Sequence, residues 1–129
     1  MESTIFIVGR ILLGGFFVYS GFNHFKGIAM MSGYAQMKGV PKPKPSVAFT
    51  GALLLVGGLS ILLGVYPTVG VAVLALFLVP ATYMMHAFWK IQDPMARMGE
   101  KVNFAKNVAL LGAALSLLAI PQPWTVSLF

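Results

Sequence analysis

Two stretches of this chain are too long and too apolar to belong to a soluble domain of its size. Residues 46–66 and 68–89 contain no Asp, Glu, Lys or Arg, and a helix needs about 20 apolar residues to cross the hydrocarbon core of a bilayer. In lipid, backbone polar groups must pair within the segment, which favours helices over open strands. Because only Pro67 separates the two stretches, we expect them to form an antiparallel hairpin of transmembrane helices.

Two further stretches have the same character, with one basic residue each. Residues 4–25 are interrupted only by Arg10, and residues 102–120 contain Lys106 near their start. The whole chain is 58% hydrophobic and 9% charged, whereas about 25% of the residues of an average soluble domain are charged. We therefore expect an all-α membrane protein with one domain over residues 1–129, folded as an antiparallel bundle of four transmembrane helices.

Several residues at the expected boundaries are typical of helix starts. Ser46 is predicted to cap the second span and Thr68 the third, because a side-chain oxygen there can accept from the first backbone N–H groups. Asp93 followed by Pro94 predicts a further helix start. Apolar residues recur at helical spacing in the first and third loops, which predicts short interfacial segments there.

The basic residues predict the orientation in the membrane. Apart from Arg10 and Lys106, every Lys and Arg lies in the loops 26–45 and 90–101, namely Lys26, Lys38, Lys42, Lys44, Lys90, Arg97 and Lys101. The positive-inside rule therefore places both loops in the cytoplasm and both termini outside, in a multi-pass protein of the cell (inner) membrane. The net charge of +6 is explained by this orientation, and nucleic acid is not an expected partner.

Small residues repeat at a seven-residue step in three of the expected helices. The sets are Gly14-Gly15 with Gly21, Gly57-Gly58 with Gly64, and Gly112-Ala113 with Ala119. This step keeps small side chains on one seam, where two helix backbones can approach closely. We interpret the seams as packing surfaces of the bundle; they would also permit a homo-oligomer.

Arg10 is the most costly residue of the sequence to place in lipid. A charged side chain at mid-membrane costs on the order of 2.5–3.5 kcal/mol on insertion scales, and Arg10 lies roughly 9 Å inside the first span. Two interpretations stay open: the side chain reaches the outer headgroups, or it contacts an anion, a carbonyl or a quinone oxygen within the bundle. The three carboxylates are all expected outside the spans, at Glu2, Asp93 and Glu100, so no embedded acid is predicted to pair with it.

A second set of polar residues lies where the spans meet the basic loops, and it comprises Asn23, His24, His86, Asn103, Lys106 and Asn107. In a closed bundle these side chains would meet beneath the first loop. Helix capping and headgroup contact is the simpler interpretation, and for Lys106 alone it is preferred. His24 and His86 together also permit a hydrogen-bonding or proton-handling site. With Arg10, these residues are the candidate ligand-binding site, and no catalytic residue is assigned.

The residue composition excludes several classes of cofactor site. The chain has no cysteine, which excludes disulfides and thiolate metal sites. Two histidines and few carboxylates do not predict a metal centre. Met84, Met85 and His86 would form a soft ligand set for Cu(I), but methionine is far more often an adaptable packing residue. No phosphate-binding loop or nucleotide motif is present. No cofactor is evident from the sequence, and a bound quinone stays open.

Five pieces of the sequence carry a family resemblance through their order and spacing. They are residues 9–17, residues 39–41, Gly57-Gly58 with Gly64, residues 86–89 and residues 103–112. Together they resemble the DoxX family of small four-helix membrane proteins across nearly the whole chain, and 103–112 is the most specific piece. The resemblance implies a bacterial-type inner-membrane protein and marks Arg10, His86, Lys106 and Asn107 for testing. Many relatives carry a glutamate where this chain has Leu54, so an Arg–Glu pair within the bundle is not expected here.

The resemblance also implies a functional setting. DoxX relatives have been associated with quinone-linked sulfur oxidation and with oxidative or thiol stress, so we expect a small membrane subunit or accessory factor of an oxidoreductase system. Its partners would be a quinone and soluble oxidoreductases. A non-enzymatic scaffold that recruits soluble partners through the basic loops is the alternative, and a small transporter or channel is a weaker one. An autonomous redox enzyme is not expected, because the chain lacks cysteine, an embedded carboxylate and a cofactor motif.

Overall fold

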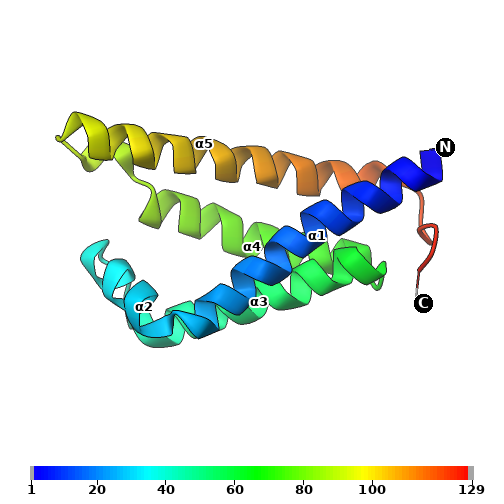
Figure 1. Cartoon of the computed structure of the whole chain (residues 1–129), viewed down its shortest axis with the longest axis horizontal. Coiled ribbons are helices and arrows are strands. Elements are labelled where there is room, and N and C mark those ends of the chain that lie inside the picture. Colours follow the sequence, from blue (N-terminus) through cyan, green and yellow to red (C-terminus); the bar gives the residue numbers. More distant parts are fainter. Residues whose placement is uncertain (1, 128–129) are drawn as a thin grey trace.

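A computed structural model describes residues 2–127 and shows a helical protein (Figure 1). The elements are α1 (Glu2–Lys26), α2 (Ile28–Met37), α3 (Pro43–Leu63), α4 (Pro67–Met85), the 3-10 turn η1 (Phe88–Lys90), α5 (Pro94–Ser116) and the 3-10 turn η2 (Leu117–Ala119). The helices α1, α3, α4 and α5 are long and apolar enough to cross a membrane. The predicted fold class, an all-α protein with four membrane-spanning helices, is confirmed. The predicted domain 1–129 includes residues 1, 128 and 129, which lie outside the described part.

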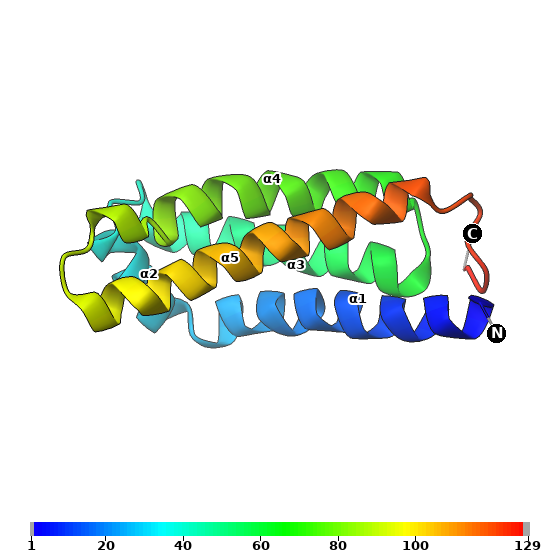
Figure 2. The same cartoon turned by 90° about the horizontal axis from the view of Figure 1, so that it is seen from above.

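The four long helices pack in sequence, α1 on α3, α3 on α4 and α4 on α5, while the short α2 lies against α3. Both termini lie at one end of the bundle, which we call the terminal end (Figure 2). The opposite end, which we call the loop end, holds α2, η1 and the start of α5. From the terminal end to the loop end, α1 and α5 diverge (Figure 1). The bundle is therefore wider at the loop end.

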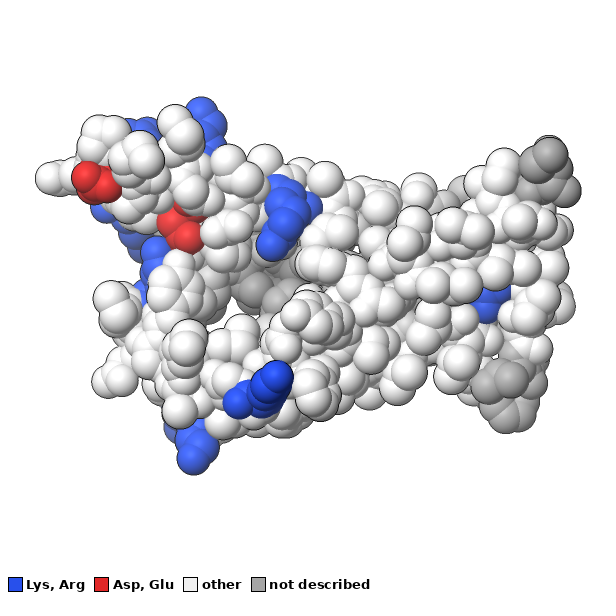
Figure 3. Space-filling model, in the orientation of Figure 1, with Lys and Arg blue, Asp and Glu red and all other residues white. Residues whose placement is uncertain are grey.

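Basic side chains gather at the loop end, as the sequence pattern requires (Figure 3). The terminal end is almost free of blue atoms on the face shown. This distribution follows directly from the two basic loops lying side by side. The side of the membrane on which they lie stays a prediction.

Glycine allows α1 and α3 to approach closely. A Cβ built on Gly21 would lie 2.9 Å from the Gly51 carbonyl oxygen, and one built on Gly58 would lie 2.8 Å from the Val18 backbone nitrogen. Such separations leave no room for any side chain. The packing interpretation of the first two small-residue seams is therefore confirmed at these positions. Gly112 of the third seam has no atom from another part of residues 2–127 within 4 Å of a built Cβ.

Proline sets the starts of three helices, because its fixed φ suits the first helical position and it needs no N–H partner there. Lys42 and Tyr66 precede the prolines that begin α3 and α4. The predicted caps Ser46 and Thr68 are therefore wrong: both lie within helices, and the Ser46 hydroxyl instead donates to the Pro41 carbonyl at 2.8 Å.

The Asp93 cap is confirmed, since its Oδ2 accepts from the Ala96 N–H at 2.9 Å. The helix that it starts continues unbroken from Pro94 to Ser116. The fourth membrane-spanning helix thus begins well before residue 102, and the apolar residues expected in an interfacial segment form its first turns.

Candidate functional site

Arg10 is buried at the terminal end, with 3% of its surface exposed. Its Nε donates to the Ile61 carbonyl at 3.1 Å, and one terminal nitrogen donates to the carbonyls of Leu62 at 3.2 Å and Val126 at 3.1 Å. The other terminal nitrogen donates to the Thr125 carbonyl. The headgroup interpretation is therefore wrong. The carbonyl interpretation holds, but the carbonyls belong to the chain's own backbone, so Arg10 joins α1 to the end of α3 and to the C-terminal segment.

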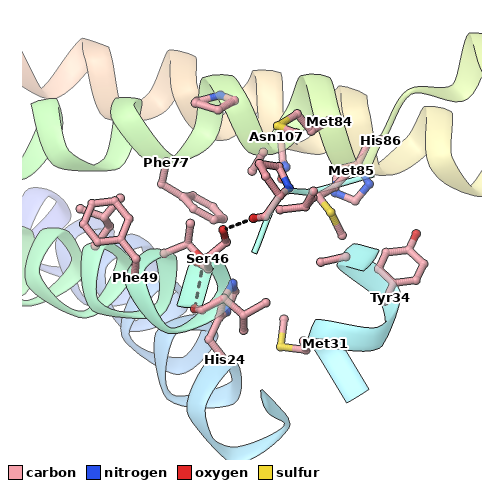
Figure 4. A pocket seen from close by; sticks show the side chains of 18 of the residues that line it. His24, Met31, Tyr34, Ser46, Phe49, Phe77, Met84, Met85, His86 and Asn107 are labelled. Carbon is pink, nitrogen blue, oxygen red and sulfur yellow. Dashed lines mark hydrogen bonds between the residues drawn. The ribbon is translucent and has the colours of Figure 1, made fainter. Parts of the chain in front are cut away.

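The main cavity lies at the loop end and has a volume of about 480 Å³. Its walls come from the ends of α1 and α4, the start of α3, the middle of α5 and one side of α2. Most of the lining is apolar, with Phe49, Phe77, Met84 and Met85 among the larger side chains (Figure 4). The Tyr34 hydroxyl points toward the side of the cavity where His86 lies.

Glu100 organises the polar residues beside this cavity. Its Oε1 accepts from the Tyr34 hydroxyl at 3.0 Å and from the Asn103 amide at 3.2 Å. Its Oε2 lies 3.1 Å from Lys38 Nζ and 3.2 Å from His86 Nδ1. We call these five residues the Glu100 cluster. Because its members come from α2 and its C-terminal cap, the end of α4 and α5, the cluster ties together the three elements that would otherwise separate at the wide end.

Sequence reasoning missed Glu100. It was expected in the third loop, in a short interfacial segment outside the spans, yet it lies in α5 with 8% of its surface exposed. A carboxylate is therefore buried between the helices at the loop end. One signal was present: Glu100, Asn103 and Asn107 are spaced three and four residues apart and share a helix face. Lys106, which was grouped with that face, is exposed and lies over the Phe16 ring at 6.0 Å instead.

The cavity and the Glu100 cluster share two residues. Tyr34 and His86 both line the cavity while they bond to Glu100. A buried carboxylate with four donors is well compensated, because each lone pair that leaves water finds a partner. The cluster therefore supplies the cavity with fixed polar groups and no unpaired charge.

Asn107 is the polar residue of α5 that lines the cavity. It is buried, with 7% exposure, and its amide makes no hydrogen bond to any residue in the described range 2–127. Buried amides nearly always have partners. The predicted site residue Asn107 is thus placed where it can donate and accept toward a molecule in the cavity.

His24 lies across the cavity on α1. Its Nδ1 lies 2.8 Å from the Ser20 carbonyl, to which it donates, and its ring meets the Phe77 ring edge-on at a centroid distance of 5.9 Å. Of the six polar residues predicted to meet, the cavity wall includes His24, His86 and Asn107, and the cluster includes Asn103. Asn23 and Lys106 are not part of either.

Met84 and Met85 line the cavity together with His86 (Figure 4). Within residues 2–127, no group of three or more His, Asp or Glu side chains is arranged to hold a metal ion. The two thioethers contribute to the apolar wall, a role that suits methionine's flexible side chain.

The surroundings of Tyr34 perturb its acidity. Partial burial raises the pKa of the Tyr34 phenol above its ordinary value, and the hydrogen bond to the Glu100 carboxylate raises it further. Lys38 opposes both effects. The raised pKa keeps the phenol protonated, so that it remains a donor to Glu100 across the physiological pH range.

The arrangement as a whole can hold a neutral, mainly apolar molecule that carries hydrogen-bonding oxygens. Ligand cavities are commonly about 300–1,000 Å³, apolar in most of their lining, with a few polar groups that fix orientation. Asn107 offers a donor and an acceptor, and His86 offers a ring nitrogen held by Glu100. The cavity is more than a packing defect, because polar groups converge on it.

Comparison with protein families matches residues 5–87 to the family described as DoxX. The matched part contains Arg10 and His86, whereas Glu100, Asn103 and Asn107 on α5 lie beyond it. Comparisons with curated proteins and with solved structures gave no match.

Proposed function

The chain belongs to the DoxX family, and from this premise we propose that it is a small membrane subunit or accessory factor of a quinone-linked oxidoreductase system. The quinone headgroup would bind in the cavity at the loop end. The observation that carries this proposal is the pairing of an apolar cavity of about 480 Å³ with the amide of Asn107, which has no hydrogen-bond partner among residues 2–127.

The chemistry of a quinone fits this lining. Its ring is flat and apolar, and its two carbonyl oxygens accept hydrogen bonds without carrying charge. The apolar wall would pack against the ring through van der Waals contacts, which replace those that lipid makes with it. The amide N–H of Asn107 can donate to one oxygen. A charged substrate fits less well, because Glu100 is already paired with Lys38 and leaves no free charge at the wall.

The proposal is tested on the full-length protein purified in mild detergent. Bound lipids are extracted and quinone is quantified per mole of protein, and 1,4-naphthoquinone binding is then measured by titration. Asn107→Leu keeps the side-chain volume and removes the hydrogen bond. We expect the dissociation constant to rise about tenfold, since a hydrogen bond contributes about 1 kcal/mol or somewhat more in an apolar site. Asn23→Leu is the matched control outside the cavity and should leave binding unchanged.

A folded protein that neither retains nor binds quinone would contradict the proposal. Capture of a soluble oxidoreductase by such a quinone-free protein would favour the scaffold alternative, in which the exposed lysines of the loop end are the contact surface.

A further inference from the structure

One ring nitrogen of His86 is hydrogen-bonded to the Glu100 carboxylate, and His86 also lines the cavity. Nδ1 lies 3.2 Å from Glu100 Oε2, and His86 lines the cavity with Asn107 (Figure 4). Among the described residues, no hydrogen bond to Nε2 is formed. His86 is thus oriented from one side only.

The carboxylate fixes which nitrogen carries the proton. An ionised Glu100 can only accept, so Nδ1 must donate and therefore bears hydrogen in both protonation states of the ring. In the neutral imidazole, Nε2 is then the nitrogen with the free lone pair. The Glu100 carboxylate thus holds the His86 ring in one tautomer, in which Nε2 can accept a proton.

We propose that His86 Nε2 is a proton acceptor for a hydroxyl group bound in the cavity, with Glu100 as its positioning residue. The ligand class is a phenol or hydroquinone, the reduced counterpart of the quinone, so this inference rests on the proposed function. In the step, the ligand O–H bond breaks and an N–H bond forms at Nε2. The electron pair stays on the ligand oxygen, which becomes an oxyanion, and no change of oxidation state occurs.

Neighbouring groups suit both charges that this step creates. The imidazolium lies next to the Glu100 carboxylate, and a hydrogen bond between charged partners is roughly twice as strong as a neutral one. The Asn107 amide lines the same cavity and can donate to the oxyanion. Each charge that the proton transfer creates therefore has a partner: Glu100 for the imidazolium and Asn107 for the oxyanion.

Several charged and titratable groups surround His86. From α2 and its end, Tyr34 and Lys38 face the same carboxylate, and α1 contributes His24 across the cavity. Lys90 of η1 is exposed, and Lys101 of α5 lies over the Phe88 ring at 5.9 Å. The Lys38 side chain is 20% exposed, so the Glu100 cluster lies between the cavity and water.

The test uses full-length protein in detergent and two probes. They differ only in that a methyl group replaces the hydroxyl hydrogen in the second. The first, 4-nitro-1-naphthol, changes its visible absorption when its hydroxyl is deprotonated. The second, its methyl ether, cannot lose a proton and reports occupancy of the cavity alone. The pH midpoint at which the bound naphthol ionises is measured in the wild type and in variants.

His86→Asn removes the basic nitrogen while an amide can still donate to Glu100. We expect the ionisation midpoint of the bound naphthol to rise by about one pH unit, a tenfold change in proton affinity, with ether binding unchanged. Glu100→Gln keeps an acceptor for Nδ1 but removes the countercharge, and a smaller rise is expected. His24→Asn removes the other cavity imidazole, whose Nδ1 faces the Ser20 carbonyl and not a carboxylate, and it should move the midpoint less than His86→Asn does.

An unchanged midpoint in His86→Asn, with the ether still bound, would overturn the inference and leave the quinone proposal standing. Failure of the wild type to bind either probe or 1,4-naphthoquinone would overturn the proposed function itself. A midpoint that moves equally in the His24 and His86 variants would also contradict the assignment, because it would indicate a general change in cavity polarity.

Discussion

The guanidinium of Arg10 lies over the ring of Trp124, with Cζ 5.3 Å from the ring centroid. Phe6 lies at a similar distance, 5.5 Å, and meets Trp124 edge-on at 5.1 Å. Trp124 itself is buried, with 3% exposure. A cation between two aromatic rings is stabilised by their negative faces. This contact, together with four backbone carbonyls, holds the C-terminal segment onto α1 and α3.

Replacing Arg10 should destabilise the terminal end. Arg10→Met removes the donors of the Ile61 and Leu62 carbonyls and should lower the free energy of unfolding by about 3 kcal/mol, because buried acceptors left without donors cost about 1–3 kcal/mol each. Arg10→Lys keeps the charge but loses the planar fork of donors, and an intermediate loss is expected. Thermal unfolding in detergent measures both. Equal melting temperatures for Arg10→Met and the wild type would contradict the assigned role.

Two glycines of α1 should respond differently to the same substitution. Gly21→Ala places a Cβ 2.9 Å from the Gly51 carbonyl oxygen, and overpacking of this kind costs about 1–3 kcal/mol. Gly15→Ala is the matched control, since within the described chain no atom beyond its own helix lies within 4 Å of the new Cβ. We expect a lower melting temperature for the first variant only. Equal effects of the two substitutions would show that α1 does not pack on α3 through this seam.

Alkaline pH should weaken the attachment of α2. Because the folded pKa of the Tyr34 phenol is raised, its contribution to stability is fully present below the ordinary pKa of tyrosine and is lost as pH rises through the folded value. A difference in ultraviolet absorbance between the wild type and Tyr34→Phe isolates this phenol from the other tyrosines. We expect it to ionise later than free tyrosine. Ionisation at or below the ordinary value would mean that the Tyr34–Glu100 hydrogen bond is absent in solution.

The absence of native cysteine makes the orientation directly measurable. Ser3→Cys and Lys44→Cys each introduce one exposed thiol, at the terminal end and the loop end respectively. With a membrane-impermeant maleimide, Ser3→Cys should be labelled in intact cells, and Lys44→Cys only after the membrane is permeabilised. The reverse pattern would place the basic loops outside and overturn the prediction from the positive-inside rule.

The helical framework could be predicted from the sequence because lipid leaves few choices. Uncharged runs of about 20 residues must pair their backbone groups internally, and the prolines at positions 43, 67 and 94 mark helix starts. The errors at Ser46 and Thr68 arose because two signals competed. Proline at the first helical position fixed the start, and the hydroxyl residues that follow were left inside the helix.

The site was harder to predict because it depends on distant contacts. Glu100 lies between Gly99 and Lys101, a context typical of a solvated turn, and its burial depends on Tyr34 and Lys38, which are 66 and 62 residues away. Arg10 was recognised as unusual, but its partners are backbone carbonyls, which have no side-chain signature. His86 and Asn107 were predicted as candidates, and both line the cavity.

The partners of Arg10 also impose an order on biosynthesis. Two of the carbonyls that accept from it belong to Thr125 and Val126, which are 115 and 116 residues further along the chain. When α1 enters the bilayer, those residues have not been translated, so its guanidinium must be solvated in another way. The first helix therefore reaches its final state only when Thr125 and Val126 have been synthesised and have folded back onto it, so the terminal end closes after all four long helices have been made.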